Sequence, residues 1–237
     1  YMDLVDKKID KDINMALAAE SYKELIATEK ASGKLKYSAQ AATSIGLIKN
    51  LLINSGVEAT KANNNLEGAK KLYEAYQLDK KDTIYLYYAA STYVSAKDYD
   101  KSMELYNELK RLNYSGKGTE YLAVSKLDGQ EVGFASAAER DKAVKIGTHE
   151  KPRTEEIPSK RGEIYKNMAL ILVDQGKIAE AKKAVSDARA ANPDDSSLML
   201  TEANLYLQTK DFDRYKQIIT EVLAKNPNDA GLVYNLG

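Results

Sequence analysis

The only imidazole in the chain, His149, lies beside Glu150 in a segment that also carries Glu155 and Glu156. A histidine with neighbouring carboxylates can transfer protons or help to hold a metal ion. The segment also contains proline and is crowded with charge, which is typical of a solvated loop. The residues therefore favour a surface histidine over a catalytic or metal-binding one.

A second candidate is the glycine-containing stretch Ser115–Thr119, whose Gly and Lys could suggest a phosphate-binding loop. Such loops follow the spacing G-x-x-x-x-G-K-[ST] after a strand, and this spacing is absent here. We interpret the stretch as a turn that leads into a helix.

The composition excludes several classes of protein. Lys+Arg and Asp+Glu are both 35 in a chain of 237 residues, so no net charge steers it toward nucleic acid. Zero cysteines exclude disulfides and thiolate chemistry. The longest apolar run, Met168–Val173, is about six residues, far below the roughly 20 that span a bilayer. We expect no catalytic residues, no cofactor, no metal site, no nucleic-acid partner and no membrane-spanning segment.

A short turn sequence recurs with a fixed period. Asn192–Asp195 is repeated as Asn226–Asp229, 34 residues later, and Gly176–Ile178 corresponds to Lys210–Phe212 at the same offset. Each turn lies between stretches with apolar residues at helical spacing. A fixed period of this length indicates stacked units that each bury a face against the next.

Three spans, 83–116, 162–195 and 196–229, resemble the tetratricopeptide repeat, a helix-turn-helix unit of 34 residues. Each has a small residue where the two helices approach, and the second and third end in proline: Ala90, Ala169, Ala203, Pro193 and Pro227. The resemblance implies an all-α fold, an α-solenoid of stacked repeats that forms a right-handed superhelix.

The rest of the chain follows the pattern less closely. We expect a partial N-terminal repeat at 1–33, a long-helix repeat at 34–82, a degenerate repeat at 117–161 and the start of a further repeat at 230–237. In the degenerate repeat, 119–127 is predicted as a short first helix, followed by a second helix with Ser136 and Glu139 as a capping box. An inserted loop is predicted at 147–161. Because both ends fall inside repeats, we expect a fragment of a longer protein.

The strings at 76–83, 147–153 and 161–167 are similar to exported bacterial envelope proteins that carry these repeats. The similarity implies a cleaved signal peptide in the precursor and a location in the bacterial periplasm or cell envelope. It implies no defined biochemical activity.

In the tetratricopeptide repeat family, the first helices line a concave groove that accepts a peptide or a partner helix. Among the family positions carried over to this chain, the predicted contact residues are Ile84, Tyr87, Ser91, Val94, Lys166, Leu170, Val173, Leu200, Asn204 and Leu207. Only Lys166 and Asn204 have the residue types of the family's carboxylate clamp, so we expect no such clamp.

The resemblance thus predicts a non-enzymatic protein-protein interaction module that binds a peptide or a partner protein in this groove. The alternative is a structural spacer or an oligomerisation element of a larger envelope protein whose activity lies elsewhere. A homo-oligomer is compatible with either hypothesis.

Overall fold

The computed structural model describes residues 11–225 and divides the chain into two compact units, 1–112 and 113–237. Each unit is described by itself. The predicted further repeat at 230–237 and the second Asn-Pro turn at 226–229 lie outside the described residues. No helix within residues 11–225 is long and apolar enough to cross a membrane.

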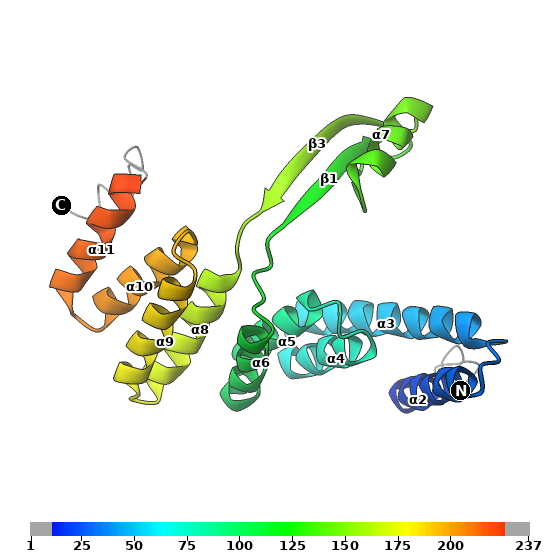
Figure 1. Cartoon of the computed structure of the whole chain (residues 1–237), viewed down its shortest axis with the longest axis horizontal. Helices are drawn as coiled ribbons and strands as arrows, with labels where there is room; N and C mark the ends of the chain where they lie inside the picture. The colour runs from blue at the N-terminus through cyan, green and yellow to red at the C-terminus, as the bar shows by residue number, and fades with distance from the viewer. Residues whose placement is uncertain (1–10, 226–237) are drawn as a thin grey trace. The chain divides into compact units, whose positions relative to one another are not determined.

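Unit 1 is helical throughout its described part, and each helix packs on the next along the chain (Figure 1). Its elements are α2 (Lys11–Ser32), α3 (Ser38–Lys61), α4 (Asn65–Leu78), α5 (Ile84–Ser95) and α6 (Tyr99–Arg111).

The close packing of α3 on α4 depends on a pair of glycines. A Cβ atom on Gly68 would lie 2.9 Å from the carbonyl oxygen of Gly56 and 2.3 Å from Thr60 Oγ1. Only glycine permits this approach, which offsets its low helix propensity. Between α5 and α6, the buried Ser102 hydroxyl donates to the Ala90 carbonyl at 3.0 Å. Small residues therefore bring the helices of unit 1 together.

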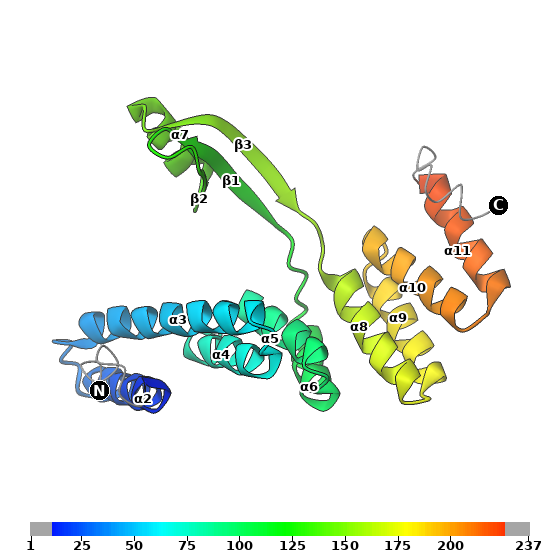
Figure 2. The same ribbon diagram turned by 180° about the vertical axis from the view of Figure 1, so that it is seen from behind.

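The described part of unit 2, up to residue 225, ends in four helices that pack as two successive pairs (Figure 2). They are α8 (Arg161–Asp174), α9 (Ile178–Ala191), α10 (Ser196–Gln208) and α11 (Phe212–Lys225). Met199 and Ala203 of α10 bury against Ile218, Ile219 and Val222 of α11. Each regular repeat that the sequence predicts therefore holds two helices among the described residues.

The repeated turns share one backbone conformation. Lys97, Gly176 and Lys210 all have positive φ, at 59°, 75° and 58° respectively, just after the first helix of each pair. The left-handed residue ends one helix and lets the chain reverse into the next. This geometry explains why the same short sequence recurs with the period of the repeat.

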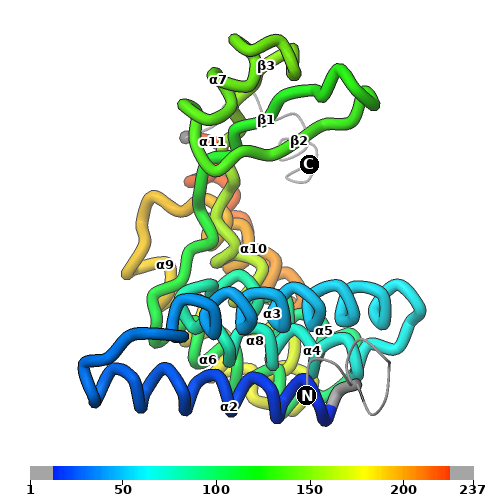
Figure 3. Tube along the Cα trace, turned by 90° about the vertical axis from the view of Figure 1, so that its right-hand side faces the viewer, coloured from blue at the N-terminus to red at the C-terminus, as the bar shows by residue number. Residues whose placement is uncertain are grey.

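Along the chain, before α8, unit 2 contains a small sheet that the sequence analysis did not predict. Figure 3 traces its strands, which are antiparallel in the order β2-β1-β3. The elements are β1 (Gly118–Ser125), β2 (Glu131–Phe134), α7 (Ala137–Ile146) and β3 (His149–Ile157). Apart from this minor sheet, the predicted all-α repeat fold is confirmed.

Two predictions for this inserted segment were wrong. Residues 119–127 form β1 and the turn that follows rather than a helix, and most of the predicted loop 147–161 is the strand β3. Both strands are fixed by pairing across a long sequence separation, with Tyr121 opposite Thr154 and Leu122 opposite Arg153. The predicted helix after Ser136 is confirmed, with Ser136 Oγ accepting from the Glu139 amide at 3.2 Å.

The two ends of the inserted segment are held side by side. The Lys160 amide donates to the Ser115 carbonyl at 2.7 Å, and Arg161 donates to the carbonyl and side-chain oxygens of Asn113 at 3.1 and 3.0 Å. Gly116 has φ 64°, and a Cβ there would lie 2.6 Å from Lys160 Cγ. The stretch proposed as a turn therefore closes the base of the sheet.

Candidate functional site: a hollow between α8 and α10

The helices α8 and α10 expose part of one face each. In α8, Ile164 and Met168 are buried, while Lys166 and Leu170 are exposed four residues apart. Residues four apart lie on the same side of a helix. The same holds in α10, where Leu200, Asn204, Leu207 and Gln208 are exposed.

These faces border a hollow of about 220 Å³. Three of its lining residues, Ala169, Thr201 and Leu205, are buried and form its base. The other five are exposed and form its rim: Lys166, Leu170, Asn204, Leu207 and Gln208. Four predicted groove residues are thus brought together here, whereas Val173 and Leu200 lie on the same helices outside the lining.

The rim carries polar groups that are not used elsewhere. The side chains of Lys166, Asn204 and Gln208 make no hydrogen bond or ion pair with any residue in the described part of the chain. One ammonium group and two carboxamides therefore stand beside the leucines with their donors and acceptors free.

A close approach of α8 and α10 sets the width of this hollow. The Gly162 amide donates to Ser197 Oγ at 3.1 Å, and Thr201 Oγ1 donates to the Gly162 carbonyl at 3.0 Å. A Cβ on Gly162 would lie 2.6 Å from Ser197 Cβ. The glycine and two hydroxyl side chains thus join the two first helices directly.

Asp195, just before α10, ties this pair of helices to the base of the inserted sheet. Its buried carboxylate accepts hydrogen bonds from the Ser159 and Ser197 hydroxyls and lies 3.8 Å from Arg161 Nη1. Burial opposes the charged form, but the two hydroxyls and the nearby Lys117 outweigh it and hold the pKa of Asp195 below its ordinary value of 3.8. The carboxylate is therefore a structural anion.

The predicted groove residues of unit 1 are placed differently. Ile84, Ser91 and Val94 of α5 are half-buried, and Tyr87 is only 4 % exposed. The hollow of about 410 Å³ between α3 and α5 is lined by none of them. Its lining is Ile53, Val57, Thr60, Lys61, Leu72, Tyr85, Tyr88 and Thr92.

The sequence analysis did not select Tyr85 and Tyr88. Each follows a family position, Ile84 or Tyr87, by one residue. Their spacing of three residues along α5 places both on one helix face. That spacing is the signal in the sequence that could have identified the pair. It does not show which of the tyrosines of α5 are buried and which are exposed.

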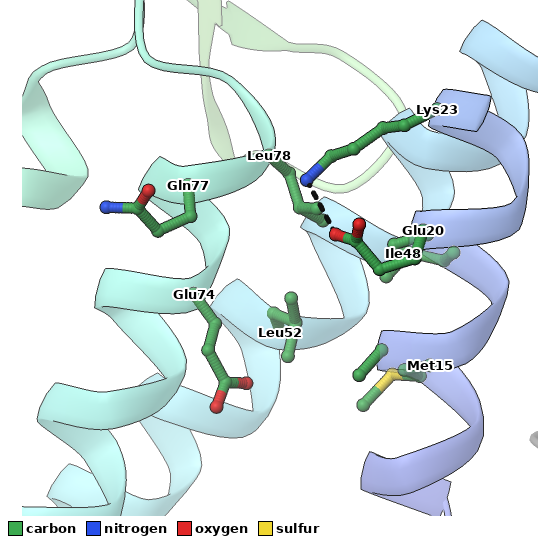
Figure 4. A pocket seen from close by; sticks show the side chains of 10 residues that line it. Met15, Glu20, Lys23, Ile48, Leu52, Glu74, Gln77 and Leu78 are labelled. Carbon is green, nitrogen blue, oxygen red and sulfur yellow. Dashed lines mark hydrogen bonds and ion pairs between the residues drawn. The ribbon is translucent and has the colours of Figure 1, made fainter. Parts of the chain in front are cut away.

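A third hollow, of about 160 Å³, lies among α2, α3 and α4. Figure 4 shows Met15, Ile48 and Leu52 along its apolar side and the ion pair between Glu20 and Lys23, at 3.2 Å, at its edge. It contains no residue predicted for the groove.

His149 lies at the start of β3 and is enclosed by ordinary contacts. Its Nδ1 is 2.9 Å from Thr148 Oγ1, and its ring meets Phe134 edge-on at 5.1 Å between centroids. Among residues 11–225, no group of three or more His, Asp or Glu side chains is placed to hold a metal ion.

Comparison with known proteins agrees with the repeat architecture. Residues 172–236 match the tetratricopeptide repeat family. A tetratricopeptide repeat protein from Parabacteroides merdae is similar in structure, with 15% identity, a TM-score of 0.49, and coverage of 93% of this chain and 71% of that one. No curated protein matches the chain by sequence.

Two further solved structures are similar at lower scores. PilF of Pseudomonas aeruginosa is 13% identical with a TM-score of 0.44, covering 90% of this chain and 78% of that one. YrrB, described as a tetratricopeptide repeat protein with an unusual peptide-binding site, is 15% identical with a TM-score of 0.39, covering 92% and 81%. The family match over residues 172–236 and the paired helices α8 to α11 give this part of the chain the architecture of tetratricopeptide repeats.

Proposed function

We propose that the chain is a non-enzymatic binding module that holds an extended segment of a partner protein against α8 and α10. The observation that carries this proposal is the hollow bounded by Lys166, Leu170, Asn204 and Leu207. The proposal excludes Tyr87 from the contact surface, because its side chain is buried.

The chemistry of the rim suits a peptide. Leu170 and Leu207, which are 38 % and 41 % exposed, offer an apolar surface to a partner side chain. The carboxamides of Asn204 and Gln208 can each donate to a carbonyl and accept from an amide, which matches the alternation along a peptide backbone. Lys166 can donate to a further carbonyl or to an acidic side chain. An apolar centre with a polar rim is the usual composition of a protein interface.

Site-specific photo-crosslinking in cells of the native source tests the proposal. A photoreactive amino acid at Leu207 should capture a partner, and the same group at Ile178 should not. Ile178 is a matched control, since it lies on α9 of the same unit and is 43 % exposed against 41 % for Leu207. Adding Lys166→Glu and Leu170→Arg to the Leu207 probe should abolish the adduct.

The result also separates the two functional hypotheses. Equal adducts at both positions, or none at Leu207, would overturn the groove proposal. An adduct that contains only a second copy of this chain would favour an oligomerisation element instead. Light scattering of the purified protein then measures the oligomeric state.

We also propose a location in the bacterial envelope. The residue strings at 76–83, 147–153 and 161–167 support it through their similarity to exported repeat proteins. Fractionation of source cells with an antibody to this chain tests it, and recovery with cytoplasmic markers alone would contradict it.

A further inference from the structure

The inserted sheet has an apex where two loops meet. The turn after β1 and the junction between α7 and β3 are joined by a hydrogen bond from the Lys126 amide to the Thr148 carbonyl, at 3.0 Å. Within the first loop, Gly129 donates to the Ser125 carbonyl at 2.9 Å, and Asp128 accepts from the Gln130 amide at 3.1 Å. The backbone of the apex is therefore well connected, although its side chains face solvent.

We define the apical surface as Lys126, Leu127, Lys142, Lys145 and Ile146. Leu127 is 94 % exposed and Ile146 is 66 % exposed. No residue of α7 is buried. A single exposed leucine would carry little information. Here Leu127, in the turn after β1, and Ile146, the last residue of α7, both stand at the apex, and neither takes part in the core of the sheet.

Three lysines near these aliphatic side chains carry unpaired charges. Lys126, Lys142 and Lys145 make no ion pair with any residue that the structure describes. Asp128 is engaged within its own turn, and Asp141 accepts from Arg140 at 2.9 Å. Since the whole chain has a formal net charge of zero, this cationic apolar surface is a local feature.

We propose that the apical surface docks on an anionic lipid membrane. In such docking, exposed aliphatic side chains enter the headgroup region while lysines meet the lipid phosphates. The charge of the three lysines is complementary to an anionic surface. The apical surface lines none of the hollows described above. Its side chains project outward, so they can insert into a lipid membrane, which deforms around them. This site is independent of the hollow between α8 and α10.

Because the chain contains no tryptophan, a single introduced indole reports on the apex alone. The full chain with Leu127→Trp should show a blue shift of its emission with mixed phosphatidylcholine–phosphatidylglycerol vesicles and none with phosphatidylcholine alone. Leu35→Trp is the matched control, since Leu35 is 70 % exposed between α2 and α3. Its emission should stay unchanged.

Charge variants on the Leu127→Trp background then test the lysines. Each lysine near an anionic surface strengthens binding by about fivefold. The double variant Lys126→Glu with Lys145→Glu should therefore weaken the affinity for anionic vesicles by about 25-fold or more. Lys70→Glu with Lys110→Glu, which reverses two exposed charges of unit 1, should change it little. Added salt should also weaken binding.

Several outcomes would overturn the proposal. They are no blue shift with anionic vesicles, an equal shift with neutral vesicles, or a shift of the Leu35→Trp control. Circular dichroism checks that each variant is folded. The salt dependence of vesicle binding by Leu127→Trp tests the electrostatic contribution without any charge variant.

Discussion

Unit 1 has a hollow of about 410 Å³ between α3 and α5, whereas unit 2 has one of about 220 Å³ between α8 and α10. The two units also differ in where a glycine lets two helices approach closely. In unit 1, Gly56 and Gly68 join α3 to α4, within a helix pair. In unit 2, Gly162 joins α8 directly to α10, between the two first helices. The glycine contact thus lies within a helix pair in unit 1 and between the first helices of neighbouring pairs in unit 2.

The lining also differs. The hollow of unit 1 is bordered by Tyr85, Tyr88 and Val57, with Lys61 as its charged residue. The hollow of unit 2 is bordered by leucines with an ammonium group and two carboxamides. Four residues at family positions border the hollow of unit 2, whereas none borders the hollow of unit 1, and this is why we assign partner binding to unit 2.

The largest expected effect is a difference in stability between alanine variants of two adjacent tyrosines of unit 1. Tyr87→Ala should lower the free energy of unfolding by about 3–5 kcal/mol, because it removes a large buried side chain. Tyr88→Ala should cost no more than about 1 kcal/mol, since Tyr88 is 45 % exposed. Denaturant unfolding measures both. If Tyr87→Ala were stable but lost its partner, then Tyr87 would be a contact residue, as the family position implies.

A smaller effect tests the role of the glycines. Gly68→Ala and Gly162→Ala should each destabilise the protein by about 1–3 kcal/mol through overpacking, although alanine normally favours a helix. Only Gly162→Ala should also weaken partner capture, because it separates α8 from α10. Gly46→Ala is the control, since a Cβ there meets nothing within 4 Å, and it should stabilise by roughly 0.5–1 kcal/mol. Equal behaviour of all three variants would contradict the comparison.

The sequence predicted those features that depend on local patterns. The period of the turns gave the helix pairs, and Ser136 with Glu139 gave the start of α7. The strands were missed because they are held by distant pairing, such as Leu122 with Arg153, and because nearly all side chains of β3 are exposed. A strand without a buried face has no apolar alternation to detect.

For the candidate site, too, the local sequence does not show how neighbouring helices pack. Lys166, Leu170, Asn204 and Leu207 occupy family positions on helices of ordinary length, and the structure brings all four to one hollow. In α5 the family positions do not line the hollow, since the buried side of that helix includes Tyr87 together with Leu86, Ala90 and Tyr93. Which tyrosine of such a helix is buried depends on the neighbouring helices, and the local sequence does not specify it.

The smallest expected effect concerns Asp195, whose carboxylate accepts from two serine hydroxyls, whereas Asp82, at the same place before α5, pairs with Lys49. Its pKa is held below 3.8 in the folded protein, so its charge stabilises the fold fully above that pH, and this contribution is lost as the pH falls through the folded value. Asp195→Asn should therefore cost about 1–2 kcal/mol at neutral pH, where charge-assisted hydrogen bonds from Ser159 and Ser197 are weakened. The difference from the parent protein should shrink below about pH 4. Urea unfolding at a series of pH values measures this, with Asp174→Asn, an exposed residue of α8, as the control. A stability difference that is the same at every pH would show that shape rather than charge matters at this position, and that the carboxylate does not anchor the inserted sheet to α10.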